Sequence, residues 1–188
     1  ICDDRGLLML VDEVQTGMGR IGTLFGYQKF PSVEPDVMTL AKALGSGAPL
    51  GAFTTKEFCS VLEPGDHGST FGGNALTTAA GAAAAKVLVD EDIPAMADET
   101  GAYFQGKLKA LAEMHDCITE VRGMGLLIAL EMSKDISGAV VTDALPKGLL
   151  INAVRPNMIR FMPPLNVSND EIDEAVEILD RVLAEAGK

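Results

Sequence analysis

The sequence lacks several features that define whole classes of proteins. None of its apolar runs approaches the ~20 residues that a membrane-spanning helix needs, so we expect no membrane partner. It has no G-x-x-x-x-G-K-[ST] loop of the kind that holds nucleotide phosphates. Acidic residues outnumber basic ones, 27 against 15, and the net charge of −12 argues against binding to nucleic acid or to a membrane surface.

Cysteine is also scarce. The three cysteines, Cys2, Cys59 and Cys117, form neither a metal-ligand spacing nor a redox pair. Scattered cysteines are typical of a reducing compartment. We therefore predict a cytoplasmic protein with no bound metal.

What the chain does have is enough apolar sequence for a sizeable core, 47% of its 188 residues. Residues 1–88 alternate apolar strands with Gly-rich loops, which is typical of an α/β protein with a mostly parallel sheet. Residues 89–188 combine helices with short strands, which predicts a smaller α+β domain. The fully apolar strand predicted at residues 7–11 is of the kind that parallel sheets cover on both faces. Its neighbours must come mostly from elsewhere, so we expect the chain to be the C-terminal part of a longer protein.

The pattern of apolar residues and turn residues predicts the individual elements. Strands are predicted at residues 7–11, 37–40, 51–54, 117–121 and 126–132, and from residue 158 up to a pair of prolines. Helices are predicted at residues 56–62, 75–89, 95–114 and 140–147, and after a capping box at residues 168–171.

Two carboxylates, Asp12 and Glu13, follow the first strand. The carboxyl end of a parallel strand is where open α/β sheets bind ligands. The pair is compatible with a strand-end cap or with the magnesium site of a nucleotide hydrolase. A third possibility is that Asp12 pairs with the cationic ring nitrogen of a ligand, with Gln15 as a nearby hydrogen-bond donor.

The glycines at positions 17, 19 and 22 match the dinucleotide-binding pattern G-x-G-x-x-G. That pattern requires its first glycine directly after the strand and a helix that opens there. Here several residues intervene, and the following segment is a poor helix former. A nicotinamide-dependent oxidoreductase is therefore a remote alternative.

Lys42 ends the next apolar run and is followed by three glycines and a proline. Burial at a strand end would lower the pKa of this amine and make it a nucleophile able to form an imine. The alternative is a lysine that opens a surface helix and extends into water.

Ser69 and Thr70 lie in a Gly-rich loop that leads into an Ala-rich helix. Hydroxyl and backbone N–H groups at such a place favour an anion such as a phosphate. Ordinary N-capping of the helix is the alternative.

Together, an amine, a carboxylate and an anion-binding loop are what pyridoxal 5'-phosphate (PLP) needs for its aldehyde, ring nitrogen and phosphate. In order and spacing, residues 10–17, 41–45 and 68–74 (LVDEVQTG, AKALG and GSTFGGN) resemble the signature of class III aminotransferases. These are PLP enzymes of fold type I, and the resemblance runs from residue 7 to residue 183. It implies part of the PLP-binding large domain followed by a C-terminal small domain.

The resemblance implies a role for each position. Lys42 would bind the cofactor aldehyde and move the proton, Asp12 would pair with the ring nitrogen, and Gln15 would hydrogen-bond the ring oxygen. Thr70 would reach the phosphate in the neighbouring site of a homodimer, and Ser69 would touch the substrate. The family's other phosphate-binding loop and the aromatic residue that stacks on the ring belong to an N-terminal half that this sequence does not contain.

Arg160 is implied to hold the substrate α-carboxylate as a bidentate fork, whereas Arg122 is a weaker candidate and a more structural one. Within the family, residues 64–74, 148–152 and 159–167 are most similar to members that act on N-acetylornithine. The implied reaction transfers its amino group to 2-oxoglutarate, in arginine biosynthesis. Ornithine, succinylornithine and 4-aminobutyrate are alternative donors, and a non-catalytic fragment is an alternative of another class.

Overall fold

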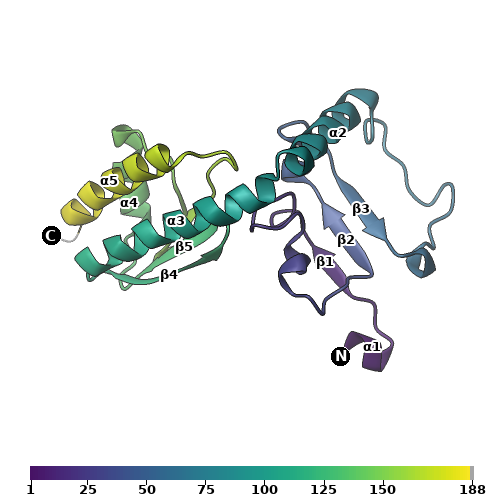
Figure 1. The fold of residues 1–188 in the computed structure, drawn as a ribbon, viewed down its shortest axis with the longest axis horizontal. Helices are drawn as coiled ribbons and strands as arrows, with labels where there is room; N and C mark the ends of the chain where they lie inside the picture. Colours follow the sequence, from purple (N-terminus) through teal and green to yellow (C-terminus); the bar gives the residue numbers. More distant parts are fainter. Residues whose placement is uncertain (187–188) are drawn as a thin grey trace. The chain divides into compact units, whose positions relative to one another are not determined.

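The computed structural model describes residues 1–186. The chain divides into two compact units, Ile1–Pro94 and a second unit that begins at Ala95 (Figure 1). The domain boundary predicted between residues 88 and 89 stays a prediction.

The first unit is built on a three-stranded sheet of β1 (Leu10–Asp12), β2 (Val37–Leu40) and β3 (Ala52–Thr55), in that order. Strands β1 and β2 are parallel, with Asp12 opposite Thr39, and β3 runs antiparallel to β2. The predicted α/β character is thus confirmed, with a mixed sheet in which the third strand is reversed.

The first predicted strand is shorter than expected and is not covered. Leu7 and Leu8 precede β1, and Leu7, Leu8 and Leu10 are 54%, 53% and 66% exposed. Nothing in the described chain covers this apolar segment, in agreement with the expectation that most of its neighbours come from elsewhere. The helix predicted at residues 56–62 is also wrong in extent, because only the 3₁₀ helix η3 (Glu57–Cys59) forms there. A short helix, α1 (Cys2–Arg5), precedes the sheet.

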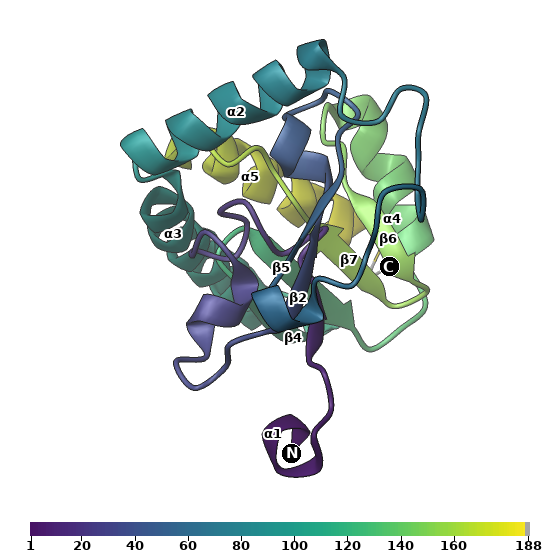
Figure 2. The same cartoon turned by 90° about the vertical axis from the view of Figure 1, so that its right-hand side faces the viewer.

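An irregular loop leads from η3 to helix α2 (Ala75–Asp90) and is visible in two views (Figures 1 and 2). The Asn74 side chain caps this helix by accepting the backbone N–H groups of Leu76 and Thr77, both at 3.1 Å. A Cβ atom added to Gly81 would lie 2.5 Å from Leu50 Cδ2 and 3.2 Å from the Leu44 carbonyl oxygen. Glycine at this position therefore allows α2 to approach the segment that follows β2.

The second unit has a four-stranded antiparallel sheet in the order β4-β5-β7-β6. Its elements are α3 (Ile93–Met114), β4 (Ile118–Met124), β5 (Leu127–Met132), α4 (Ser137–Ala144), η4 (Leu145–Lys147), β6 (Asn152–Arg155), β7 (Met158–Phe161) and α5 (Asn169–Ala186). The residues around 122–124, which the sequence placed between two strands, instead complete β4. The helix predicted at 140–147 begins earlier and ends as a 3₁₀ turn.

One face of this sheet forms the core. In β5 every second residue is buried, with Ile128, Leu130 and Met132 at most 1% exposed. Phe161 from β7 meets Phe104 of α3 edge to face, with ring centroids 5.2 Å apart. The alternation also leaves the opposite face of the sheet for polar and charged side chains.

Helix α5 starts at the predicted capping box. The Glu171 carboxylate accepts the backbone N–H of Ser168 at 2.8 Å, and the Ser168 hydroxyl accepts the backbone N–H of Glu171 at 3.2 Å. The first hydrogen bond lowers the pKa of Glu171.

The described residues lack two features, a membrane-spanning helix and a metal-binding cluster. No helix within residues 1–186 is both long enough and apolar enough to cross a membrane. The same part of the chain holds no cluster of three or more His, Cys, Asp or Glu side chains arranged to bind a metal ion.

Candidate active site

Asp12, Gln15 and Lys42 lie at the carboxyl edge of the parallel pair β1 and β2, where Gln15 and Lys42 are in contact. Asp12 is the last residue of β1, and Lys42 begins the 3₁₀ helix η2 (Lys42–Gly45), just after β2 ends at Leu40. The Lys42 amine lies 3.4 Å from the Gln15 side-chain oxygen. Parallel pairing places both strand ends at one edge, so residues 27 positions apart in sequence become neighbours.

The Asp12 carboxylate is oriented but not neutralised. Its Oδ1 atom accepts the backbone N–H of Val14 at 2.9 Å and the Thr39 hydroxyl at 3.4 Å. No lysine, arginine or histidine of the described chain lies within salt-bridge distance of it. A fixed carboxylate without a cation partner is suited to pair with a cationic group of a ligand.

Lys42 has an unusual backbone conformation, with a φ of 45°. This left-handed region is uncommon for residues other than glycine and costs on the order of 1 kcal/mol or more. The side chain is exposed on the described chain, so the predicted burial is not seen. No carboxylate of the described residues lies within salt-bridge distance of the amine.

Glu13, which the sequence analysis left without a role of its own, is the buried member of the carboxylate pair at 3% exposure. Its carboxylate accepts the backbone N–H of Tyr27 at 2.7 Å and the hydroxyl of Thr16. A Cβ atom added to Gly26 would lie 2.8 Å from this carboxylate. Glu13 therefore holds the loop after β1 in shape. The adjacent position of Asp12 and Glu13 was the only sequence signal, and strand alternation assigns the two residues to opposite sides.

The dinucleotide-binding alternative lacks its structural context. Residues 13–25 form turns and bends, and the next regular element is the short 3₁₀ helix η1 (Gly26–Lys29). The fingerprint needs a helix that opens at the glycines and directs its N-terminus at a pyrophosphate. No such helix is present in this part of the described chain.

Ser69 and Thr70 lie in the exposed loop before α2. The Ser69 hydroxyl accepts the backbone N–H of Gly72 at 2.9 Å, and Asn74 is the residue that caps the helix. No hydrogen bond joins Ser69 or Thr70 to Asp12 or Lys42. The ordinary N-cap interpretation is thus wrong for both residues, and their anion-binding role stays a prediction.

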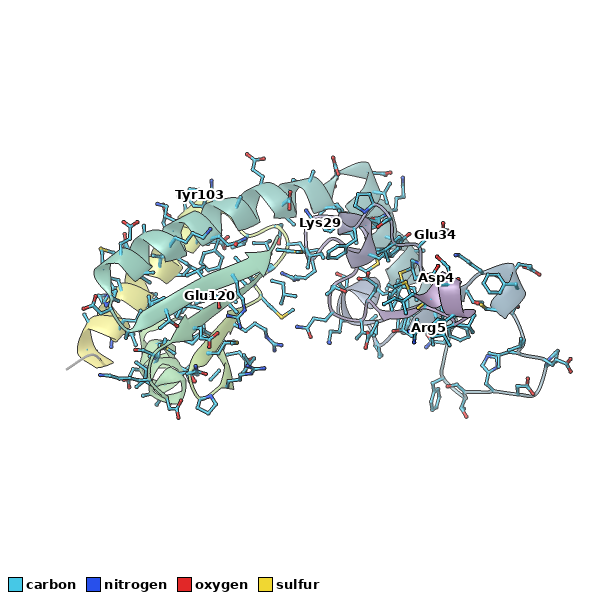
Figure 3. All side chains as sticks on the ribbon, turned by 90° about the horizontal axis from the view of Figure 1, so that it is seen from below. Asp4, Arg5, Lys29, Glu34, Tyr103 and Glu120 are labelled. Atoms are coloured by element: carbon cyan, nitrogen blue, oxygen red, sulfur yellow. The ribbon has the colours of Figure 1, made fainter. Side chains whose placement is uncertain are left out.

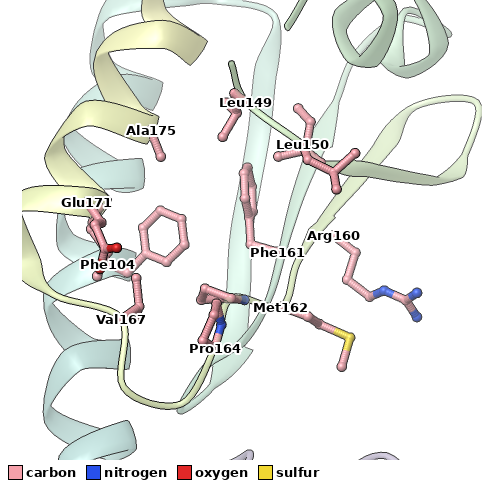
Figure 4. A pocket seen from close by; sticks show the side chains of 13 residues that line it. Phe104, Leu149, Leu150, Arg160, Phe161, Met162, Pro164, Val167, Glu171 and Ala175 are labelled. Atoms are coloured by element: carbon pink, nitrogen blue, oxygen red, sulfur yellow. The ribbon is translucent and has the colours of Figure 1, made fainter. Parts of the chain in front are cut away.

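Arg160 belongs to the second unit, in the middle of β7. Its Nη2 atom donates to the Asn152 side-chain oxygen at 3.0 Å. Figure 4 shows its side chain pointing away from the rings of Phe104 and Phe161. It stands at the rim of a cavity of about 360 Å³, whose other lining residues are mostly apolar.

Arg122, the weaker candidate, is paired with two carboxylates. Its guanidinium donates to Glu120 at 2.5 Å and to Glu131 at 2.7 Å. Glu120 is labelled in Figure 3. The hydrogen bond with Glu131 is the main reason why the pKa of Arg122 is raised and that of Glu131 is lowered. Two carboxylates on one guanidinium indicate a structural ion-pair network.

Comparison with known proteins gives one consistent family. The family model described as aminotransferase class-III matches residues 1–183. The acetylornithine aminotransferase of Caldanaerobacter subterraneus subsp. tengcongensis is 49% identical over 185 residues, and that of Gloeobacter violaceus is 47% identical over 184 residues. These matches cover 98% and 97% of this chain but 47% and 46% of the relatives.

Solved structures agree with the sequence matches. The ornithine delta-aminotransferase of Plasmodium falciparum superposes with a TM-score of 0.91 at 37% identity, and covers 98% of this chain and 48% of that one. The acetylornithine aminotransferase of Elizabethkingia anophelis gives 0.89 at 34% identity, with 98% and 47% covered. The chain therefore spans about half the length of the relatives it matches, and it belongs to the class III aminotransferase family.

Proposed function

We propose that the protein of which this chain forms a part is a PLP-dependent aminotransferase. The observation that carries the proposal is that Lys42, in contact with Gln15, follows β2 at the edge where Asp12 ends the parallel strand β1. This edge of the sheet carries an amine without a carboxylate partner and a carboxylate without a cation partner. Unless they serve a ligand, two such charged groups would be expected to pair with side chains of opposite charge. The left-handed backbone at Lys42 supports the proposal, because such strain is concentrated at functional sites.

These residues fit the groups of PLP. When bound, PLP supplies an aldehyde that an amine attacks and a protonated ring that withdraws electrons from the substrate's α-carbon. Lys42 would hold the cofactor covalently and then, as a free amine, carry the proton removed from that carbon. Asp12 would keep the ring nitrogen protonated through its charge. Gln15, beside the lysine, would hydrogen-bond the ring's oxygen substituent.

The remaining predicted roles complete the site. Thr70 would bind the phosphate in the neighbouring subunit of a homodimer, and Ser69 would touch the substrate. The exposed, Gly-rich loop that carries them presents hydroxyls and backbone N–H groups that suit such contacts. Arg160 would bind the substrate carboxylate.

For the reaction we propose transfer of an amino group from N-acetylornithine to 2-oxoglutarate, in cytoplasmic arginine biosynthesis. The support is that relatives at 44% to 49% identity are named acetylornithine aminotransferase. Ornithine is the second candidate donor, because the TM-score with an ornithine aminotransferase structure is 0.91, against 0.89 with an acetylornithine aminotransferase structure.

The test is a panel of amino donors offered to the full-length protein with 2-oxoglutarate and PLP. The panel holds N-acetylornithine, ornithine, succinylornithine and 4-aminobutyrate, and glutamate formation is measured. We expect the highest kcat/KM with N-acetylornithine. A higher kcat/KM with ornithine would overturn the proposal that N-acetylornithine is the donor. No transamination with any donor would overturn the proposed activity.

A further inference from the structure

Two arginines lie in one row on the outer face of the second unit's sheet. Arg122 on β4 is directly opposite Ala129 on β5, and Ala129 is directly opposite Arg160 on β7. Directly opposed residues point to the same face of a sheet. Ala129 has only a methyl group, so no large side chain stands between the two arginines.

The two guanidinium groups differ in the charge of their partners. Arg122 contacts the carboxylates of Glu120 and Glu131. Arg160 instead donates to the amide oxygen of Asn152, which is directly opposite it on β6. Within its own unit, no described carboxylate lies within salt-bridge distance of Arg160.

This difference decides which arginine can receive an anion. A guanidinium has five N–H donors and cannot accept a hydrogen bond, so its partner must offer a lone pair. A carboxylate partner offers a lone pair and also cancels the charge, whereas an amide offers the lone pair alone. Asn152 therefore restrains the orientation of Arg160 and leaves its charge, and most of its donors, for a bidentate carboxylate.

We propose that Asn152 is a positioning residue that prepares Arg160, through a neutral acceptor, to bind the carboxylate of an amino-acid or 2-oxo-acid substrate. The proposal rests on the aminotransferase function proposed above and adds a positioning residue to it. A purely structural role of Asn152 predicts the opposite result for Asn152→Asp. If the contact only held β6 and β7 together, aspartate at position 152 would strengthen it by forming an ion pair.

The test compares Asn152→Asp and Asn152→Ala in the full-length protein, with Arg122→Gln as the control. We expect Asn152→Ala to raise the KM for 2-oxoglutarate about fivefold through lost orientation. Asn152→Asp should raise it about 50-fold, because the new carboxylate competes for the guanidinium. In both variants kcat should change much less than KM, and the Arg122→Gln variant should keep its KM within about twofold.

Binding of glutarate, a dicarboxylate that cannot react, gives a readout besides activity. Isothermal titration calorimetry should show its Kd rising in the same order, with the thermal unfolding midpoint of the Asp variant unchanged or higher. If the starting protein transaminates and the Asp variant keeps its KM and its Kd for glutarate, the inference is wrong. If the starting protein does not transaminate, the proposed function fails instead.

Discussion

The two units of the chain differ in how much of their apolar sequence they bury. In the second unit, helices α3, α4 and α5 and one face of the sheet share a core in which residues such as Leu108, Leu130 and Val182 are fully buried. In the first unit, Leu10 and Phe53 on the sheet are 66% and 51% exposed. One unit therefore has a core of its own, whereas the sheet of the other presents apolar residues to solvent.

The proposed cofactor site lies in the unit that is less well packed. Asp12 and Lys42 are placed there by the backbone pairing of β1 with β2, and the loop between them is held by the buried Glu13. Arg160 stands on a strand whose other face is part of a dense core. The residues proposed to bind the cofactor are therefore positioned by strand pairing, whereas the arginine proposed to bind the substrate is positioned by a packed core.

The largest expected effect tests the packing difference directly. Leu130→Ala in the second unit should lower the free energy of unfolding by about 2–5 kcal/mol, since it removes a fully buried side chain and leaves a cavity. Leu10→Ala in the first unit should change it by less than about 0.5 kcal/mol, because that side chain is exposed. Urea unfolding of the 188-residue chain measures both, and equal effects would contradict the comparison.

A smaller effect is expected at Gly101 in α3. A Cβ atom there would lie 2.1 Å from the carbonyl oxygen of Gly125, at the turn after β4, so backbone must move. Gly101→Ala should destabilise the unit by about 1–3 kcal/mol. Gly106→Ala, in the same helix with nothing within 4 Å, should instead stabilise it by about 0.5–1 kcal/mol. The order of the two unfolding midpoints is the measurement, and a reversed order would refute the close approach of α3 to this turn.

The smallest effect concerns acid. Hydrogen bonds from the Met9 backbone and then Lys56 lower the pKa of Asp36 in the first unit, and Lys107 and then Tyr103 lower that of Asp173 in the second. Because each pKa is lower in the folded chain, the unfolded chain binds more protons in acid. The stability from each contact is therefore present at neutral pH and is lost as the pH falls below 3.8, the ordinary pKa of an aspartate.

Asp36→Asn and Asp173→Asn should each reduce the loss of stability between about pH 6 and about pH 3. Unfolding in urea at both pH values measures this. If either variant loses as much stability between these pH values as the starting protein, or more, the replaced carboxylate does not contribute to the loss of stability in acid.

Much of this architecture could be predicted because it depends on local signals. The capping box at Ser168 and Glu171 and the apolar strand at residues 126–132 were readable, since each reflects a pattern of neighbouring residues. The direction of β3 was not, because nothing local tells parallel pairing from antiparallel. The exposure of Leu7, Leu8 and Leu10 follows from the expected lack of neighbouring strands, but its extent depends on which other elements cover the strand.

The candidate site was predictable in its residue types rather than in its contacts. Asp12 and Lys42 could be singled out because both follow apolar strands, at the edge where open α/β sheets bind ligands. The left-handed backbone of Lys42, the burial of Glu13 and the pairing of Arg160 with Asn152 depend on tertiary structure, so no local sequence pattern predicts them.

The central claim is that Lys42 holds PLP. The most direct measurement is borohydride reduction of the full-length protein with PLP, followed by digestion and mass spectrometry of the peptides. The account predicts a reduced cofactor adduct on Lys42. The adduct should be absent in Lys42→Ala and present in Lys109→Ala, which removes an exposed lysine of α3. An adduct on another lysine, or none at all, would contradict it.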